Sequence, residues 1–189
     1  MGFFAGVLGG LLESEDPEMA KEAYQVMVDA AQESDNLLFQ SAAMDFEACI
    51  RRLNLVGNEL ELTGTYRDGS QFRWEPLKGK VVLVDFWATW CKPCVGEMPS
   101  LLAHYEKYHD KGFEIVGVSL DQDREALEQF LQQNDIPWKQ ILDPANPALE
   151  KYGIRSFPTV ILIGRDGRVT SINARGEELE KLLAELLDP

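Results

Sequence analysis

The sequence has few cysteines, few basic residues and no long apolar run, and each shortage excludes a class of protein. Three cysteines in 189 residues are too few for a disulfide-stapled scaffold. No run approaches the roughly 18 apolar residues of a membrane-spanning helix. Hydrophobic residues nevertheless make up 45% of the chain. We therefore expect a core of ordinary size that does not depend on crosslinks.

Positive charge is scarce as well. The chain carries 18 lysines and arginines against 32 aspartates and glutamates, for a net charge of −14. Phosphate backbones and anionic lipids repel such a chain, and no basic cluster opposes this, so we expect no nucleic-acid partner. The acidic residues are spread through helical stretches, which is typical of solvated helix faces.

The apolar segment Gly2–Leu12 has two interpretations. It is too short to span a membrane, and it lacks the basic region that begins a signal peptide. It is either the remainder of an export or anchor segment, or an arm that packs on a core. Membrane anchoring therefore stays open.

The chain before residue 57 has a helical pattern. Asp16-Pro17 is a helix start signal, and apolar residues recur at helical spacing on both sides of an interruption at 34–36. We predict a helical hairpin in an N-terminal domain of residues 1–56. Cys49 lies on or near the apolar face of the second helix, and we expect a buried, inert thiol there.

From residue 57 onward, strands alternate with helices. We expect strands at 80–87, 113–120, 160–163 and 169–174, and helices at 91–108, 124–134, 147–152 and 177–187. A β-hairpin around Asp68-Gly69 precedes them. This order predicts an α/β domain over residues 57–189, with a mainly parallel sheet, helices on both faces and an antiparallel edge.

The run Trp90-Cys91-Lys92-Pro93-Cys94 lies where a buried strand ends and a helix begins. Unpaired N–H groups at a helix start favour negative charge, and such a position lowers a cysteine pKa from about 8.5 to roughly 3.5–7.5. We therefore predict that Cys91 attacks a disulfide and that Cys94, one turn on, resolves the mixed disulfide.

The neighbours of the pair fit this interpretation. Pro93 suits the first helical turn, Lys92 places a cation beside Cys91, and Trp90 offers a flat apolar surface for a substrate chain. The alternative is half of a zinc site, which needs two more ligands. The remaining cysteine and histidines do not have suitable spacing. We predict no metal and no cofactor besides the redox-active disulfide.

Residues 82–94 resemble the active-site strand and helix of thioredoxins. The run Val95-Gly96-Glu97-Met98-Pro99 and the strand region 112–121 narrow the resemblance to the TlpA/ResA-like group. These are redoxin-domain thiol–disulfide oxidoreductases of bacterial cell envelopes. The resemblance covers about residues 57–189 and implies a thioredoxin-like three-layer fold, with the helical N-terminal segment as an addition.

Two acidic residues gain roles from the resemblance. Asp85 lies in a strand of valines and phenylalanine, where burial raises the pKa of a carboxyl group. In thioredoxins the matching acid moves protons for the second cysteine. Glu97 follows Cys94 by about one helical turn, and the matching glutamate of ResA-like proteins tunes the cysteine pair. The alternative is that Glu97 is simply an exposed glutamate on the helix. Either acid is a candidate proton relay for Cys94.

Two further features are compared with the family pattern. Phe157-Pro158 precedes an apolar strand, as the family's cis-proline does, and we expect a cis bond that exposes backbone groups to an extended substrate. Thioredoxins also place a lysine near the buried acid. The corresponding strand reads Val116-Gly117-Val118, so we expect no such lysine.

The resulting hypothesis is a thiol–disulfide oxidoreductase that reduces disulfides in protein substrates and receives electrons from an upstream thiol donor. One alternative is a thiol peroxidase, since peroxiredoxins share the fold, although Thr89 and Cys91 lack the peroxidase spacing. Another is a redox-silent interaction scaffold. The family resemblance implies an extracytoplasmic location, with the cytoplasm as the alternative.

Overall fold

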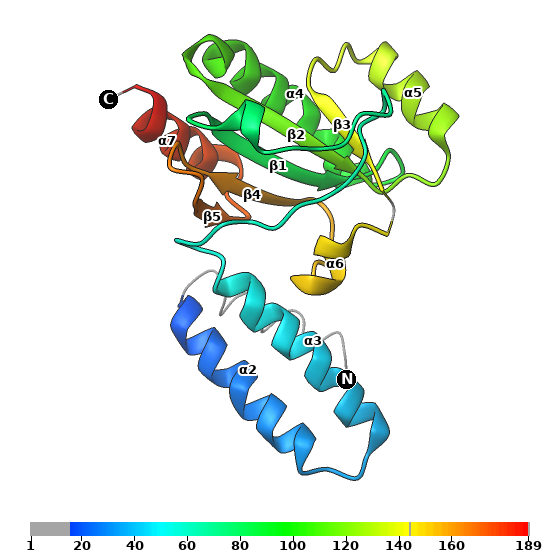
Figure 1. The fold of residues 1–189 in the computed structure, drawn as a ribbon, viewed down its shortest axis with the longest axis vertical. Coiled ribbons are helices and arrows are strands. Elements are labelled where there is room, and N and C mark those ends of the chain that lie inside the picture. Colours follow the sequence, from blue (N-terminus) through cyan, green and yellow to red (C-terminus); the bar gives the residue numbers. More distant parts are fainter. Residues whose placement is uncertain (1–15, 144, 189) are drawn as a thin grey trace. The chain divides into compact units, whose positions relative to one another are not determined.

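The protein is described by a computed structural model that covers residues 16–143 and 145–188 (Figure 1). The segment Gly2–Leu12 lies outside the described residues. The chain divides into two compact units. The helical unit contains the described residues up to Leu55 together with 148–154, and the sheet unit contains the remainder. The domain prediction did not anticipate the short segment 148–154 in the helical unit.

The helical unit is built on two helices, α2 (Pro17–Gln32) and α3 (Leu37–Leu53), that pack as a hairpin. Asp16 caps α2 because its Oδ1 accepts a hydrogen bond from the Met19 N–H at 3.0 Å. Asn36 caps α3 in the same manner. Stacked rings of Tyr24 and Phe46, 5.6 Å apart, join the two helices. The sequence pattern had predicted this hairpin.

Cys49 on α3 is half-buried, so the expectation of a fully buried thiol is wrong. Ala48 and Arg52, four residues apart, mark a buried line on this helix. Cys49 lies about 100° around the helix from Ala48 and therefore at the margin of that line.

The sheet unit contains five strands in the order β3-β2-β1-β4-β5 (Figure 1). Their bounds are β1 Val81–Trp87, β2 Phe113–Ser119, β3 Lys139–Leu142, β4 Thr159–Ile163 and β5 Val169–Ile172. All residues of β1 and β4 are buried, as their runs of valine, leucine and isoleucine predict. Strand β3 was not predicted from the sequence, because its four residues are too few to give a clear alternation of apolar and polar side chains.

The sheet is mixed. Strand β1 pairs in parallel with β2, and β2 pairs in parallel with β3. Strand β4 runs antiparallel to both β1 and β5. The antiparallel part thus includes β4 as well as the edge strand β5, which is more than the predicted antiparallel edge.

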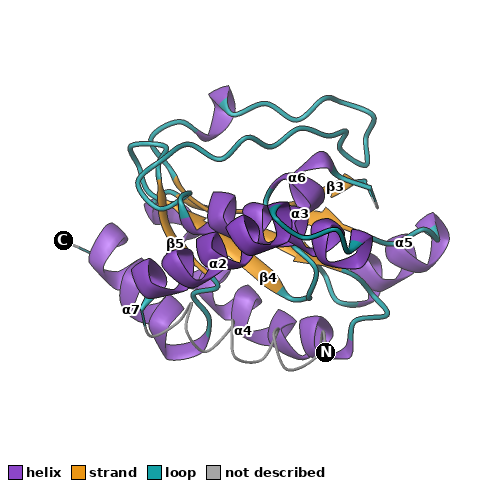
Figure 2. Ribbon diagram, turned by 90° about the horizontal axis from the view of Figure 1, so that it is seen from below, coloured by secondary structure: helices purple, strands orange, loops and turns teal. Residues whose placement is uncertain are grey.

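The helices of the sheet unit are α4 (Lys92–Tyr108), α5 (Arg124–Gln133) and α7 (Gly176–Leu187). Helix α6 (Pro147–Lys151) and the 3-10 helices η1 (Glu75–Leu77) and η2 (His109–Lys111) are short. Figure 2 shows α4 and α7 on one side of the sheet and the long segment that precedes β1 on the other.

The segment before β1 covers this second face without forming strands of its own. Instead of the predicted β-hairpin, only isolated bridges occur, such as that between Thr65 and Gln71. Gly64, with a φ of +153°, lies directly against the side chain of Ile141 on β3, which leaves no room for a Cβ atom. Apolar anchors and a tight turn therefore fix this segment in place of a ladder of hydrogen bonds.

Candidate active site

Cys91 and Cys94 lie at the junction between β1 and α4 and form a disulfide with a Cα–Cα distance of 5.3 Å. Cys91 is the N-cap residue of α4, and its Sγ accepts a hydrogen bond from the Cys94 N–H at 3.3 Å. Cys91 is 6% exposed and Cys94 1% exposed. Cys91 is therefore the outer sulfur at the positive end of a helix, and Cys94 is the inner one.

Asp121 anchors the loop that delivers Cys91. Its carboxylate accepts hydrogen bonds from the Thr89 N–H, from the Thr89 hydroxyl at 2.6 Å and from the Ser119 hydroxyl at 3.0 Å. Neither Asp121 nor Thr89 was predicted from the sequence to have a role in the site. The sequence did contain a signal for their contact. Thr89 lies two residues after β1 and Asp121 two residues after β2, and the carboxyl ends of adjacent parallel strands meet at one edge of the sheet.

An apolar surface borders the disulfide. Trp90 is 62% exposed, and its ring meets the edge of the Phe157 ring at a centroid distance of 6.2 Å. The Phe157–Pro158 peptide bond is cis, which confirms the prediction from the family pattern, and Pro158 is buried. Lys92 and Pro93 are exposed in the first turn of α4. Two separate loops thus contribute to one surface beside the cysteine pair.

Asp85 is the buried acid of the site. It is 2% exposed, and its neighbours in the sheet are Gly117 on β2 and Val160 on β4. The pKa of Asp85 is raised from 3.8 to about 7, mainly by burial and also by the nearby Glu97 carboxylate, while the Arg175 guanidinium opposes this rise. Asp85 can therefore gain or lose a proton near neutral pH.

The strand beside Asp85 carries no lysine, as predicted. Gly117 stands in register with Asp85, and the side-chain amide of Gln140 on β3 lies over Gly117. The Gln140 Oε1 accepts a hydrogen bond from the Trp87 indole N–H at 2.9 Å. The neutral Gln140 amide and the Trp87 indole thus occupy the space beside Asp85 on the side of β2.

The Glu97 side chain on α4 forms an ion pair with an arginine from another helix terminus. Arg175 Nη1 lies 3.2 Å from Glu97 Oε1, and the two side chains are 41% and 33% exposed. Arg175 is the N-cap residue of α7. Arg175 was not predicted from the sequence as a site residue, because it lies 78 residues from Glu97 and belongs to no recognised motif.

The zinc alternative finds no support among the residues that the structure describes. No group of three or more histidine, cysteine, aspartate or glutamate side chains there has a metal-binding arrangement. His104 is buried on α4, and His109 follows that helix with its Nδ1 3.2 Å from the Phe113 carbonyl oxygen. The described helices are also too short or too polar to cross a lipid bilayer.

Comparison with known protein families supports the same chemistry. The Redoxin family matches residues 40–186. A thiol-disulfide oxidoreductase ResA of Bacillus thuringiensis subsp. konkukian is 36% identical over 120 residues, which cover 64% of this chain and 69% of the relative. The ResA protein of Oceanobacillus iheyensis is 33% identical over 156 residues, which cover 82% of this chain and 75% of the relative.

Solved structures with a similar fold are oxidoreductases too. The thioredoxin domain of a thiol-disulfide oxidoreductase from Bacteroides vulgatus matches with a TM-score of 0.61 and 34% identity, over 67% of this chain and 92% of that domain. A thiol:disulfide interchange protein from Bacteroides sp. matches with a TM-score of 0.62 and 34% identity, over 69% of this chain and 88% of that protein.

Proposed function

Because the chain belongs to the Redoxin family and is a thiol–disulfide oxidoreductase, we propose that it reduces disulfide bonds in protein substrates, with Cys91 as the attacking thiol and Cys94 as the resolving thiol. The observation that carries the proposal is the position of Cys91 as the N-cap of α4, outside Cys94. The disulfide pair itself is the redox group, so the reaction needs no further cofactor.

The first step is attack by the Cys91 thiolate on a substrate disulfide. The N–H groups at the start of α4 stabilise the thiolate, which is the reactive form. A bond forms between Cys91 Sγ and one substrate sulfur, while the substrate disulfide breaks. The other substrate sulfur leaves as a thiolate and takes up a proton.

The second step is resolution of the mixed disulfide by Cys94. The Cys94 thiol gives its proton to Asp85, and the resulting thiolate attacks Cys91 Sγ. The Cys91–Cys94 disulfide forms, and the second substrate sulfur leaves as a thiol after protonation. Two electrons pass from the protein to the substrate. The buried position of Asp85 supports this role, because its pKa of about 7 lets it accept a proton at neutral pH.

The surface of Trp90 and Phe157 supports a protein substrate in place of a small one. An exposed aromatic residue beside the disulfide offers apolar contact to a peptide chain, with Lys92, Pro93 and Pro158 as its neighbours. An upstream dithiol donor must return two electrons to Cys91–Cys94 after each turnover. The proposal includes an extracytoplasmic location, which the resemblance to ResA proteins supports and which cell fractionation tests.

Insulin reduction tests the function. The wild-type protein, supplied with dithiothreitol, accelerates the precipitation of insulin chains, and Cys91→Ser abolishes this activity. Cys94→Ser accumulates a mixed disulfide that mass spectrometry detects. Equilibration with glutathione places the reduction potential toward the reducing end of the thioredoxin-fold range, which runs from about −270 to −120 mV. Unchanged activity in Cys91→Ser, or a potential near the oxidising end, contradicts the proposal.

A further inference from the structure

Arg175 occupies a helix position for which its side chain is unsuited. The N-cap of a helix favours Ser, Thr, Asp or Asn, whose oxygen atoms accept hydrogen bonds from the first backbone N–H groups. A guanidinium has only donors, and the N-cap of α7 accordingly makes no side-chain capping bond. A residue that is unfavourable at its helix position indicates a role in contacts elsewhere in the structure.

The Arg175 side chain instead contacts a residue of α4, across the cleft between α7 and α4. Its Nη1 pairs with Glu97 Oε1 on α4 at 3.2 Å and brings a positive charge beside that carboxylate. Glu97 and Arg175 line a cavity of about 180 Å³. The other residues that line it are Gly96, Ser100, Leu101, Val160, Gly176 and Leu179.

The floor of this cavity links it to Asp85. Val160 on β4 stands directly opposite Asp85 on β1, and side chains of directly opposed residues point to the same face of a sheet. Asp85 therefore projects toward the face on which the cavity lies. The cavity is polar at Glu97 and Arg175, and it exceeds many times the roughly 10–15 Å³ that one water molecule needs. The Glu97 and Arg175 side chains that line it thus lie on the face of the sheet toward which Asp85 projects.

Two charged groups among the described residues act on Asp85, one of each sign. Glu97 reaches it from α4 and raises its pKa, and Arg175 reaches it from the start of α7 and lowers its pKa. The neighbouring strands present Gly117 and Val160, which do not ionise, and α4 also carries the Cys94 thiol. Arg175 thus supplies a positive charge that acts on Asp85, whereas the strand position at which thioredoxins would carry a lysine is Gly117.

We propose that Arg175 is a positioning residue for the proton relay of Cys94. Its guanidinium holds the Glu97 carboxylate at the cavity and supplies the positive charge that lets Asp85, instead of Glu97, exchange the proton. This inference rests on the proposed function for its consequence, because the proton in question is the one that Cys94 releases when it attacks Cys91 Sγ of the mixed disulfide. No bond is made or broken at Arg175.

Titration of Asp85 in the reduced protein tests the proposal. The carboxyl-carbon NMR signal of Asp85, assigned by its loss in Asp85→Asn, is followed against pH. Arg175→Gln shifts the midpoint to higher pH by about one unit, since a nearby opposite charge lowers a carboxyl pKa by about 1–3 units. Glu97→Gln shifts it to lower pH, because a like charge is removed. Arg175→Lys, which keeps the charge, stays close to the wild type.

Lys181→Gln is the matched control. Lys181 lies on the same helix as Arg175, but its side chain is exposed and pairs only along α7 with Glu185. This variant leaves the midpoint of Asp85 unchanged. The pH at which the mixed disulfide of each variant resolves, measured by quenched flow, moves in the same direction as the NMR midpoint.

Three results overturn the proposal. One is a midpoint in folded Arg175→Gln equal to that of the wild type. Another is an alkaline shift in Glu97→Gln. The third is a shift in Arg175→Lys as large as in Arg175→Gln, which assigns the effect to packing. If Arg175→Gln does not fold, as circular dichroism reveals, the other two variants decide. The titration needs no substrate, so a failure of the proposed function appears separately, as insulin reduction that survives Cys91→Ser.

Discussion

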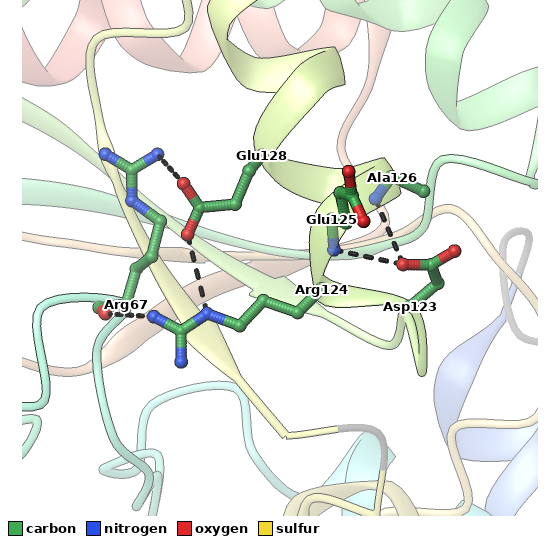
Figure 3. A network of polar contacts seen from close by, with 6 residues as sticks. All are labelled: Arg67, Asp123, Arg124, Glu125, Ala126 and Glu128. Carbon is green, nitrogen blue, oxygen red and sulfur yellow. Dashed lines mark hydrogen bonds and ion pairs between the residues drawn. The ribbon is translucent and has the colours of Figure 1, made fainter.

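The sheet unit holds two half-exposed networks of arginine and carboxylate, and only one of them acts on a buried acid. In the first, Glu128 on α5 pairs with Arg67 at 3.6 Å and with Arg124 at 3.5 Å, and Arg124 also donates to the Arg67 carbonyl oxygen (Figure 3). In the second, Arg175 pairs with Glu97 near the buried Asp85. The first network ties the segment before β1 to α5, whereas the second links α7 to the active-site helix α4.

Arginine and carboxylate side chains therefore have different effects in the two networks. At the exposed network, water screens each charge, and ion pairs of this kind contribute little to stability. At Asp85, the low-dielectric interior penalises the charged form and strengthens the effect of each nearby charge. The Arg67–Glu128–Arg124 network joins two pieces of the chain, and the Arg175–Glu97 pair, through the buried Asp85, sets the pH at which a proton moves. Four substitutions test this contrast.

Asp85→Asn has the largest expected effect. The pKa of Asp85 rises from 3.8 in the unfolded chain to about 7 in the folded protein, so the unfolded state ionises first and folding stability falls as the pH rises from about 4 to 7. A shift of about three units corresponds to roughly 4 kcal/mol. Urea denaturation at pH 8 is expected to show Asp85→Asn more stable than the wild type by up to this amount.

The advantage of Asp85→Asn disappears with acidification. Below about pH 4 both states of the wild type are protonated at this position, so the two proteins have similar stability. The variant also reduces insulin more slowly at neutral pH, since Cys94 loses its proton acceptor. A variant that is less stable than the wild type at pH 8 contradicts the assigned charge state of Asp85.

Asp121→Ala is expected to have the next largest effect. The Asp121 carboxylate accepts from the Thr89 N–H and from two hydroxyl groups, and its removal leaves buried donors without an acceptor. Hydrogen bonds to a charged group contribute about 1.5–3 kcal/mol each, so we expect a loss of roughly 3 kcal/mol in the free energy of unfolding. Because the loop before Cys91 loses its anchor, the rate of insulin reduction falls as well.

Asp123→Ala is the control for Asp121→Ala. Asp123, only two residues away, accepts two backbone N–H bonds at the start of α5 from an exposed position (Figure 3). Loss of such a helix cap costs about 1 kcal/mol, and insulin reduction is expected to remain unchanged. Equal losses of stability and activity in the two variants rule out a specific role for Asp121.

Much of the sheet unit could be predicted because local signals agree with tertiary structure. The apolar run of β1 could only be a buried strand, and Cys91 and Pro93 then define the start of α4. Asp85 was recognisable as a buried acid since a charged residue in such a run has no route to water. The cysteine pair was predictable for the same reason that it is reactive, namely its place at a helix start.

The remaining features depend on contacts that the local sequence does not encode. Strand β3 forms because β2 and the bridge from Tyr66 to Ile141 provide partners, not because Lys139–Leu142 alternates clearly. Arg175 carries an apparently ordinary charge, and only the packing of α7 beside α4 brings it to Glu97. Long-range pairs of this kind need the fold before they can be identified.

Gly117→Ala tests the side of Asp85 that is occupied by the neutral Gln140 amide. A Cβ atom at this position would collide with the Gln140 amide, which must then move away from the Trp87 indole. A buried N–H without an acceptor costs about 1–3 kcal/mol, so we expect thermal unfolding to reveal a destabilisation of roughly 2 kcal/mol. Gly96→Ala is the control, since open space surrounds that helical glycine, and alanine there stabilises the protein by about 0.5–1 kcal/mol. A stable Gly117→Ala shows that Gln140 adjusts freely.

Glu128→Gln is expected to have the smallest effect. Its partners Arg67 and Arg124 are exposed, so the loss in the free energy of unfolding stays below about 1 kcal/mol. Screening is nearly complete at about 1 M salt, where the difference from the wild type should vanish. Chemical denaturation at low and high salt measures both values. A large loss that persists at high salt, comparable with that of Asp121→Ala, shows that the network acts through packing of the segment before β1 on α5, and the contrast between exposed and buried charges then fails.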